Sequence, residues 1–326
     1  MTVDESPASI INIDLTAVVV MVADGEPYVL VLRDSGGGFD ALPFGPLQKD
    51  HGTLQAGMRS WVERRTQHRL GYIEQLYTFG DRPPWPKGLD AGTGGRTLSL
   101  AYLALVQEAH PSFVGHAAWR SWYDYFPLED WREGTPAVRE PLLAHLEGWS
   151  AAAGPRGRTA RAERIGLTFG LSERAWDDER ALERYELLYE AKLVPEAWSD
   201  AGEATAADIE ALAGRPMIQD HRRIVATAIS RLRGKIKYRP VLFELLPEKF
   251  TLLQLQRTAE ALSGMRLHKQ NFRRLVEQQR LVEETGEMAT DTGGRPAKLM
   301  RFRREVTLER PAPGVRVTAT RRAGYP

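Results

Sequence analysis

The chain contains no cysteine among its 326 residues, which excludes disulfide bonds, thiolate nucleophiles and zinc-finger sites. Its seven histidines are scattered without HExxH or any other metal-ligand spacing, so we expect no metal site. No stretch approaches the roughly 20 apolar residues needed to cross a bilayer. The first ten residues, MTVDESPASI, carry acids where a signal peptide would carry lysine or arginine. We therefore expect a cytoplasmic protein.

Net charge is also nearly absent, with 44 basic against 43 acidic residues, but the charges are unevenly spread. Residues 221–326 hold 23 Lys and Arg against 10 Asp and Glu, and residues 1–220 hold 21 against 33. An acidic body followed by a basic C-terminal third is typical of proteins whose last domain binds nucleic acid. The alternative is a basic face that only keeps that domain soluble.

The first third of the chain predicts a mixed α/β domain. The β-branched runs 14–22 and 27–33 flank the turn residues Ala23-Asp24-Gly25-Glu26 and indicate a hairpin. Apolar residues at helical spacing predict a helix over 53–69, and further strands are expected over 72–79 and 97–106.

The middle of the chain predicts helices without an obvious site. Aromatic residues crowd 119–131, which favours a core edge or subunit contact over a ligand cage. We expect a linker over 151–161, a helix that Ser172 begins and that runs to Lys192, and another helix over 206–213. Over 218–236 the apolar residues follow a seam that fits either a dimer contact or a core helix.

The segment from 238 to 304 predicts a helix-turn-helix. Thr251 and Gln254 form a capping-box pattern, and Gly264 ends the helix that they begin. A second helix, 268–280, carries apolar residues on one face and polar ones on the other, as base-reading helices do. The candidates for base contacts are Gln270, Asn271, Arg273 and Arg274, with Lys269 expected on phosphate; a solvated charged face is the alternative.

Two strands, 281–284 and 298–303, are expected after that helix, and a loop that contains glycine joins them. A helix-turn-helix followed by such a hairpin is a winged helix. Arg295 and Lys298 would contact the DNA backbone or minor groove. Winged helices also contact proteins, so the fold alone does not establish DNA binding.

The sequence resembles a known family at both ends. Leu42-Pro43-Phe44-Gly45, the following helix and 72–81 (YIEQLYTFGD) resemble a Nudix domain. Together with 231–257 (RLRGKIKYRPVLFELLPEKFTLLQLQR) and 293–302 (GGRPAKLMRF), they resemble the Nudix-related transcriptional regulators of NAD metabolism, the NrtR and NadQ types. The resemblance implies an α+β protein: a Nudix-like α/β/α sandwich, a helical connecting segment and a C-terminal winged helix-turn-helix domain.

The carboxylates of the Nudix signature, which hold Mg²⁺ on a pyrophosphate, are missing. Alignment of the helix puts Gly52 at the first Glu, Ser60 and Trp61 at the Arg-Glu pair, and Arg64 and Arg65 at the Glu-Glu pair. Two guanidinium groups cannot bind Mg²⁺, although they could bind phosphates. We therefore expect no catalytic residue and no catalytic cofactor. A Nudix pyrophosphohydrolase with an accessory nucleic-acid domain is the alternative.

The resemblance implies a homodimeric repressor of NAD-biosynthesis genes that binds a palindromic operator in double-stranded DNA and associates with the nucleoid. Its effector would be NAD, ATP or ADP-ribose. Candidate nucleotide-binding residues are Arg33, Phe44, Arg64, Arg65, Phe79 and Asp81; a solvated helix face, core packing and a turn are the alternative roles. The expected divisions are 1–150 (nucleotide-sensing), 151–215 (helical connection), 216–310 (linker helix and winged helix) and 311–326 (basic tail).

Overall fold

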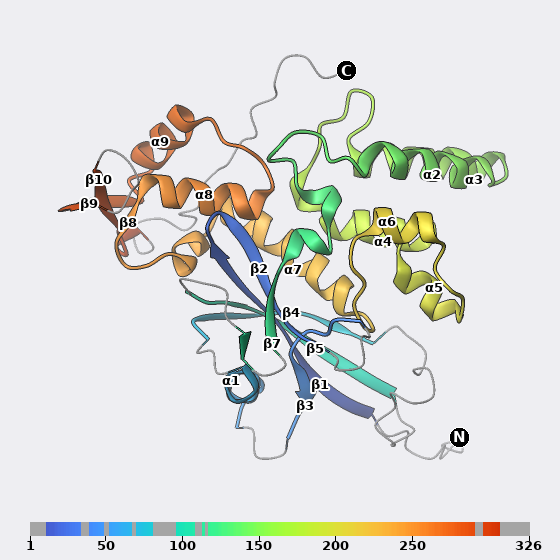
Figure 1. Cartoon of the computed structure of the whole chain (residues 1–326), viewed down its shortest axis with the longest axis horizontal. Coiled ribbons are helices and arrows are strands. Elements are labelled where there is room, and N and C mark those ends of the chain that lie inside the picture. Colours follow the sequence, from blue (N-terminus) through green and yellow to red (C-terminus); the bar gives the residue numbers. More distant parts are fainter. Residues whose placement is uncertain are drawn as a thin grey trace, which may run out of the picture.

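The computed structural model of the chain describes residues 11–33, 39–48, 52–66, 70–80, 96–107, 113–114, 117–290 and 296–306. Figure 1 shows a twisted sheet with a group of helices on one side and a small helix-and-strand module on the other. None of the described helices has both the length and the apolar character that crossing a bilayer requires.

A seven-stranded sheet forms the N-terminal part. Its main path runs β4-β5-β1-β2-β7-β6, and β3 pairs with β1. The central strand β1 lies parallel to β5 and antiparallel to β2 and β3. The strands are β1 (Ile11–Ala23), β2 (Glu26–Leu32), β3 (Phe44–Pro46), β4 (Tyr72–Phe79), β5 (Arg96–Leu105), β6 (Phe113–Val114) and β7 (Ala117–Ser121).

The β1–β2 hairpin turns through Asp24 and Gly25, whose φ angles are +51° and +78°. Ala23 pairs with Glu26, so the loop has two residues. Two positive φ angles in a two-residue loop are those of a type I′ turn, for which Asp-Gly is a favoured sequence. The predicted hairpin is confirmed.

Two helices cover the opposite faces of this sheet. Leu15, Ala17, Val19 and Met21 of β1 pack in one core cluster with Met58 and Val62 of α1 (Leu54–Thr66). Val18 and Val20 pack in the other cluster with residues of α7 (His221–Ile236). Since β-strand side chains alternate between faces, the continuous apolar run of β1 follows from burial on both sides.

The seam of α7 is therefore used inside the chain. Val225, Ile229 and Leu232 are fully buried, and the helix contacts β1 and β4 as well as α4 (Ala181–Glu190) and α8 (Leu252–Ser263). The core-helix alternative is confirmed, and this seam is not available to a dimer partner.

The middle of the chain folds as a group of helices beside α7 (Figure 1). Besides α4 these are α2 (Arg139–Ala151), α3 (Pro155–Phe169), α5 (Pro195–Ala201) and α6 (Ala207–Ala213), with 3-10 turns η1 (Trp122–Asp124), η2 (Pro127–Glu129) and η3 (Asp178–Arg180). The helix expected over 206–213 is confirmed. The aromatic stretch lies in the core: Trp122, Tyr123, Tyr125 and Phe126 are all buried.

Two expectations in this region were wrong. The predicted linker over 151–161 is the end of α2 and the start of α3, with Pro155 at the first helical position. Its exposed first turns have no apolar face, so periodicity could not indicate the helix. Ser172 begins no helix: its φ is +62°, and Asp177 instead caps η3 ahead of α4.

The C-terminal module is the predicted winged helix. Its elements are η4 (Val241–Leu245), β8 (Phe250–Thr251), α8, α9 (Lys269–Gln278), β9 (Val282–Ala289) and β10 (Ala297–Phe302). The capping box of Thr251 and Gln254 is present, and Gly264 ends α8 with a φ of +71°. Strands β8, β10 and β9 form a three-stranded antiparallel sheet.

Candidate functional site

The second helix of the winged helix presents a polar face to solvent. Phe272 and Val276 are buried against the module, and the polar candidates on α9 are all exposed: Lys269, Gln270, Asn271, Arg273 and Arg274. At about 100° per residue, Gln270 and Arg274 lie opposite the buried pair, with Arg273 beside them. Within the described part of the chain, no acid forms an ion pair with Arg273 or Arg274. These guanidinium groups are available to a polyanion.

The wing differs from α9 because its described cations already have acidic neighbours. Lys298 lies 2.7 Å from a carboxylate oxygen of Glu284, and Arg301 lies 2.5 Å from one of Glu283. These pairs join β10 to β9 across the hairpin and are largely exposed. A phosphate that contacts Lys298 would have to compete with Glu284, so its contribution to binding should be smaller than that of an unpaired cation.

The end of α8, which leads into α9, is fixed to the rest of the chain by its carbonyl groups. Tyr123 donates its hydroxyl to Ala261 O (2.6 Å), and Arg233 donates from Nε to Leu262 O (2.9 Å). The backbone N–H of Trp131 donates to Gly264 O (2.7 Å). Carbonyl groups in the last turn of a helix lack partners within that helix, so these contacts hold the helix-turn-helix in one orientation.

Arg233, which donates to the end of α8, also binds a buried carboxylate. Glu129, 3% exposed, accepts hydrogen bonds from Arg184 on α4 and from Arg233 on α7. Burial alone would raise the pKa of Glu129, but the two guanidinium groups outweigh burial and hold the pKa below its usual range. Burial raises the pKa of the neighbouring Tyr123 to about 12, so its phenol remains a hydrogen-bond donor at neutral pH.

Helix α1 is the helix that the sequence resemblance aligns with the metal-binding signature of Nudix enzymes. Arg64 is exposed, and its Nε donates to Ser60 O (3.2 Å). Glu63 is the one carboxylate on the helix, and it accepts the backbone N–H of Leu70 (3.1 Å) and lies 3.7 Å from Arg59. A shallow cavity of about 440 Å³ lies along Arg59, Ser60, Glu63 and Arg64. Its chemistry suits an anion better than a divalent cation.

The two aromatic candidates lie on the other side of the sheet from Arg64. Phe79 ends β4 and is buried in the cluster that contains the α7 residues. Phe44, on β3, has its ring centroid 5.2 Å from that of His221. Because α1 packs in the opposite cluster, Arg64 does not converge on these rings. The structure thus groups Phe44 and Phe79 with α7 and leaves Arg64 apart.

The first turn of α7 contributes two residues that the sequence did not single out. The Nδ1 atom of the buried His221 accepts the backbone N–H of Leu42 (2.9 Å), next to Phe44. The guanidinium of Arg223 lies 5.7 Å from the ring centroid of Phe79. The run His-Arg-Arg at 221–223, just ahead of the apolar residues of the helix, is a weak sequence signal and does not indicate a partner.

The remaining candidates are Asp81, Arg295, Arg65 and Arg33. Asp81, Arg295 and the side chain of Arg65 lie outside the described residues. Arg33 lies exposed just after the end of β2. The role of each in nucleotide or DNA binding stays a prediction.

One group of carboxylates could face a cation. Asp177, Asp178 and Glu179 bring ligand oxygens within 4.8 Å of one another. Lys237 forms ion pairs with Asp178 and Glu179, and Asp177 pairs with Arg180. Because basic side chains already balance these acids, we assign the group a structural role.

Comparison with known proteins identifies the C-terminal module. The family model described as the NrtR DNA-binding winged helix domain matches residues 242–302. Residues 242–302 form an NrtR-type winged helix. The curated "ADPR responsive transcriptional repressor NtrR" of Acinetobacter baylyi is 39% identical over 83 residues, which are 26% of this chain. The match spans about a third of that relative's length.

Solved structures extend the likeness in fold to most of the chain. The crystal structure of Shewanella oneidensis NrtR aligns with a TM-score of 0.51 at 20% identity, over 90% of this chain and 95% of that one. A MutT/nudix family protein from Enterococcus faecalis aligns with a TM-score of 0.50 at 14% identity, over 91% and 89% of the two chains. The resemblance to Nudix-related regulators is confirmed, as is the α+β fold of a Nudix-like domain with a C-terminal winged helix.

Proposed function

We propose that this protein is a transcriptional repressor that binds operator DNA through its NrtR-type winged helix. The observation that supports this proposal is the exposed surface of α9, where one helix presents two guanidinium groups, two amides and an ammonium group to solvent. Arg reads guanine and Asn or Gln reads adenine by paired hydrogen bonds in the major groove. The position of α9 after a helix and a turn is that of a recognition helix.

The Nudix-like domain would bind an adenine nucleotide that regulates the repressor. ADP-ribose is the first candidate, because the name of the Acinetobacter baylyi relative describes a response to it; NAD and ATP remain the other two. Arg64 and Arg65 would contact phosphate, and Phe44 and Phe79 would pack against base or ribose. Arg64 lies on a helix that packs on the opposite face of the sheet from the two rings. A ligand that contacts all three residues would therefore have to extend around the edge of the sheet, or the protein would have to change conformation when the ligand binds.

We propose no catalytic role for this domain, as a Nudix hydrolase requires several carboxylates to hold its metal. Glu63 is the one acid on α1, and it is engaged by Leu70 and Arg59. The hydrolase alternative has a direct test: purified protein with Mg²⁺ is incubated with ADP-ribose and with NAD. Cleavage at an ordinary enzymatic rate that Glu63→Gln abolishes would reject the proposal.

Helix α7 offers a physical connection between the two domains. Its first turn holds His221 against Phe44 and Arg223 near Phe79, and its fourth turn carries Arg233, which binds the end of α8. Twelve residues at 1.5 Å each separate His221 from Arg233, about 18 Å along one rigid element. A nucleotide that shifts the start of α7 would therefore move the attachment of the helix-turn-helix. To regulate, it must bind the two arrangements with different affinity.

We further propose that the repressor is a cytoplasmic homodimer that reads a palindromic operator upstream of NAD-biosynthesis genes, since a two-fold dimer matches two half-sites. A gel-shift on the promoter of the host's NAD-synthesis genes, titrated separately with ADP-ribose, NAD and ATP, tests this. We expect a retarded complex that one nucleotide strengthens or dissolves. No retardation under any condition would remove the support for DNA binding.

A further inference from the structure

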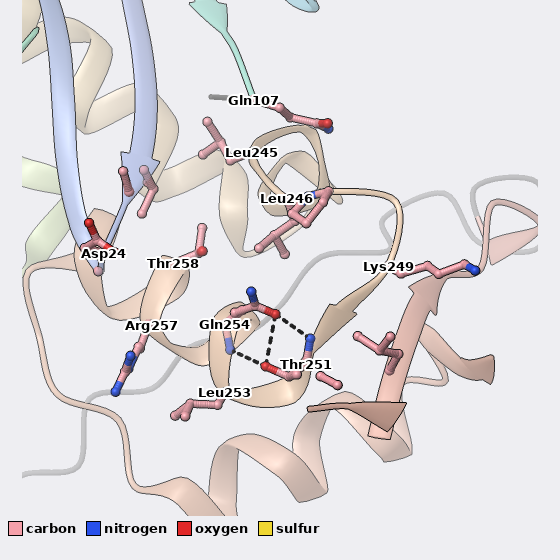
Figure 2. Close-up of a pocket in the computed structure, with 16 residues that line it drawn as sticks. Asp24, Gln107, Leu245, Leu246, Lys249, Thr251, Leu253, Gln254, Arg257 and Thr258 are labelled. Atoms are coloured by element: carbon pink, nitrogen blue, oxygen red, sulfur yellow. Dashed lines mark hydrogen bonds between the residues drawn. The ribbon is translucent and has the colours of Figure 1, made fainter. Parts of the chain in front are cut away.

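A cavity lies between the tip of the β1–β2 hairpin and the winged helix (Figure 2), and no residue of α1 lines it. Its volume is about 730 Å³, within the range of sites that hold small molecules. The tip of the β1–β2 hairpin forms one wall, and η4, α8 and the β9–β10 hairpin form the others. Leu245, Leu246 and Leu253 give it an apolar lining.

Thr258 contributes a hydroxyl group to the lining of this cavity. The residue is 4% exposed and lines the cavity from α8. Among the described residues no group forms a hydrogen bond with its hydroxyl. Figure 2 shows its side chain directed between the hairpin tip and Leu245. A hydroxyl can both donate and accept a hydrogen bond, so this one is able to bond a polar edge of a ligand in the cavity.

Other polar groups surround the cavity with both donors and acceptors. The Asp24 carboxylate lies at the hairpin tip. Gln254 uses its amide oxygen in the capping box, which leaves its amide nitrogen turned toward Leu246 (Figure 2). A heteroaromatic ring fits this mixture, because its faces are apolar while its edges carry donors and acceptors.

Cations lie at the rim. Arg257 is exposed, and none of the described acids pairs with its guanidinium. Lys249 reaches toward Glu287 on β9, which lies 2.6 Å from its ammonium. A ligand with its ring among the leucines could therefore place one anionic group at Arg257.

We propose that this cavity is a second ligand site, which binds a mononucleotide with its base inside and its phosphate at Arg257. It is separate from the candidate nucleotide residues of the Nudix-like domain. Asp24 lies eight residues along β1 and its turn from Thr16, the residue that pairs with Phe44, which corresponds to about 26 Å of extended strand. The site does not depend on what the Nudix-like domain binds.

Isothermal titration calorimetry of the full chain with AMP, adenosine and ribose 5-phosphate tests the assignment. We expect AMP to bind more tightly than either fragment, because each fragment lacks one of the two contacts. Thr258→Val keeps the shape of the side chain and removes the hydroxyl, and it should weaken AMP binding roughly threefold to tenfold, the range for one lost hydrogen bond.

Arg257→Ala should weaken AMP binding by a similar factor and leave adenosine binding unchanged. Arg239→Ala, another exposed cation that does not line the cavity, is the matched control and should leave both unchanged. The proposal is overturned if wild type shows no AMP binding, or if Thr258→Val and Arg257→Ala both bind AMP like wild type. A chain that binds operator DNA but not AMP would reject this site and leave the proposed repressor standing.

Discussion

The guanidinium of Arg233 on α7 pairs with Glu129 and donates a 2.9 Å hydrogen bond from Nε to Leu262 O at the end of α8. It thereby connects α7 both to the turn η2 and to α8. Arg233 and Glu129 are 1% and 3% exposed. The charged side chain of Arg233 on α7 is thus buried against α8, the helix that precedes α9. This contact explains how the winged helix keeps a defined position relative to the sheet.

Replacement of Arg233 by Met should lower the free energy of unfolding by about 3–5 kcal/mol, because it leaves a buried carboxylate with one cation instead of two. Urea denaturation at pH 7 measures it. Arg231→Met is the matched control on the same helix: Arg231 is half-exposed and 3.7 Å from Glu74, so its loss should cost at most about 1 kcal/mol. Equal costs for the two variants would contradict the role of Arg233.

Gly264 is packed so closely that a methyl group could be added only if its neighbours moved. A Cβ there would overlap the carbonyl oxygen of Glu129 and come within 3.0 Å of the Tyr123 hydroxyl. Gly286 on β9 also has a positive φ, +82°, but a Cβ there would meet nothing within 4 Å. Both Gly→Ala changes strain the backbone, by about 1–2 kcal/mol.

We therefore expect Gly264→Ala to destabilise the protein by about 1–3 kcal/mol more than Gly286→Ala, since overpacking adds to the strain. Thermal unfolding of the two variants measures the difference. Closely similar transition temperatures would show that the end of α8 can move away from Glu129 at little cost.

Stability should also depend on Glu74, which joins β4 to α7. Burial alone would raise the pKa of Glu74, but hydrogen bonds from Lys235 and Tyr72 outweigh burial and hold the pKa below its usual range. A carboxyl whose folded-state pKa is lowered stabilises the fold fully above its unfolded pKa, about 4.3, and loses that contribution as the pH falls through the folded value.

Glu74→Gln should therefore unfold more easily than wild type at pH 7, and the difference between the two should shrink below about pH 4. Urea denaturation at pH 7, 5, 4 and 3 measures this. A difference that stays constant over this range would show that the ionised form of Glu74 does not stabilise the fold.

Local patterns allowed the DNA-binding module to be predicted. Thr251 and Gln254 are three residues apart, and the bonds between them are made within one turn, so the sequence alone indicates where α8 begins. The polar face of α9 is equally local. By contrast, the partners of Glu129 are 55 and 104 residues away in the chain, so no pattern around Glu129 could indicate them.

The contacts of the candidate nucleotide-binding residues could not be predicted from local sequence patterns either. Arg64 and Phe79 were both chosen from segments that resemble a Nudix domain, yet Phe79 is buried on the α7 side of the sheet and α1, which carries Arg64, packs on the other side. His221 and Arg223 were missed because only the packing of α7 on the sheet brings them to Phe44 and Phe79. Helix α3 was missed because its first turns bury nothing.

Arg274 on α9 and Lys298 on the wing should contribute differently to DNA binding. Arg274 lies at the centre of the exposed face of α9, so Arg274→Ala should weaken operator binding by about 1–3 kcal/mol and relax specificity at one base pair. Lys298 is on the wing and already pairs with Glu284. Lys298→Ala should weaken binding to all sequences alike, by a smaller amount, and flatten the dependence on salt.

Fluorescence anisotropy with operator and random duplexes, each at several salt concentrations, separates the two effects. Arg239→Ala provides a control for the loss of one positive charge outside α9 and the wing. If Arg274→Ala loses the same affinity for operator and random DNA, Arg274 contacts phosphate rather than a base edge, and the reading face of α9 must then be assigned to Gln270, Asn271 and Arg273.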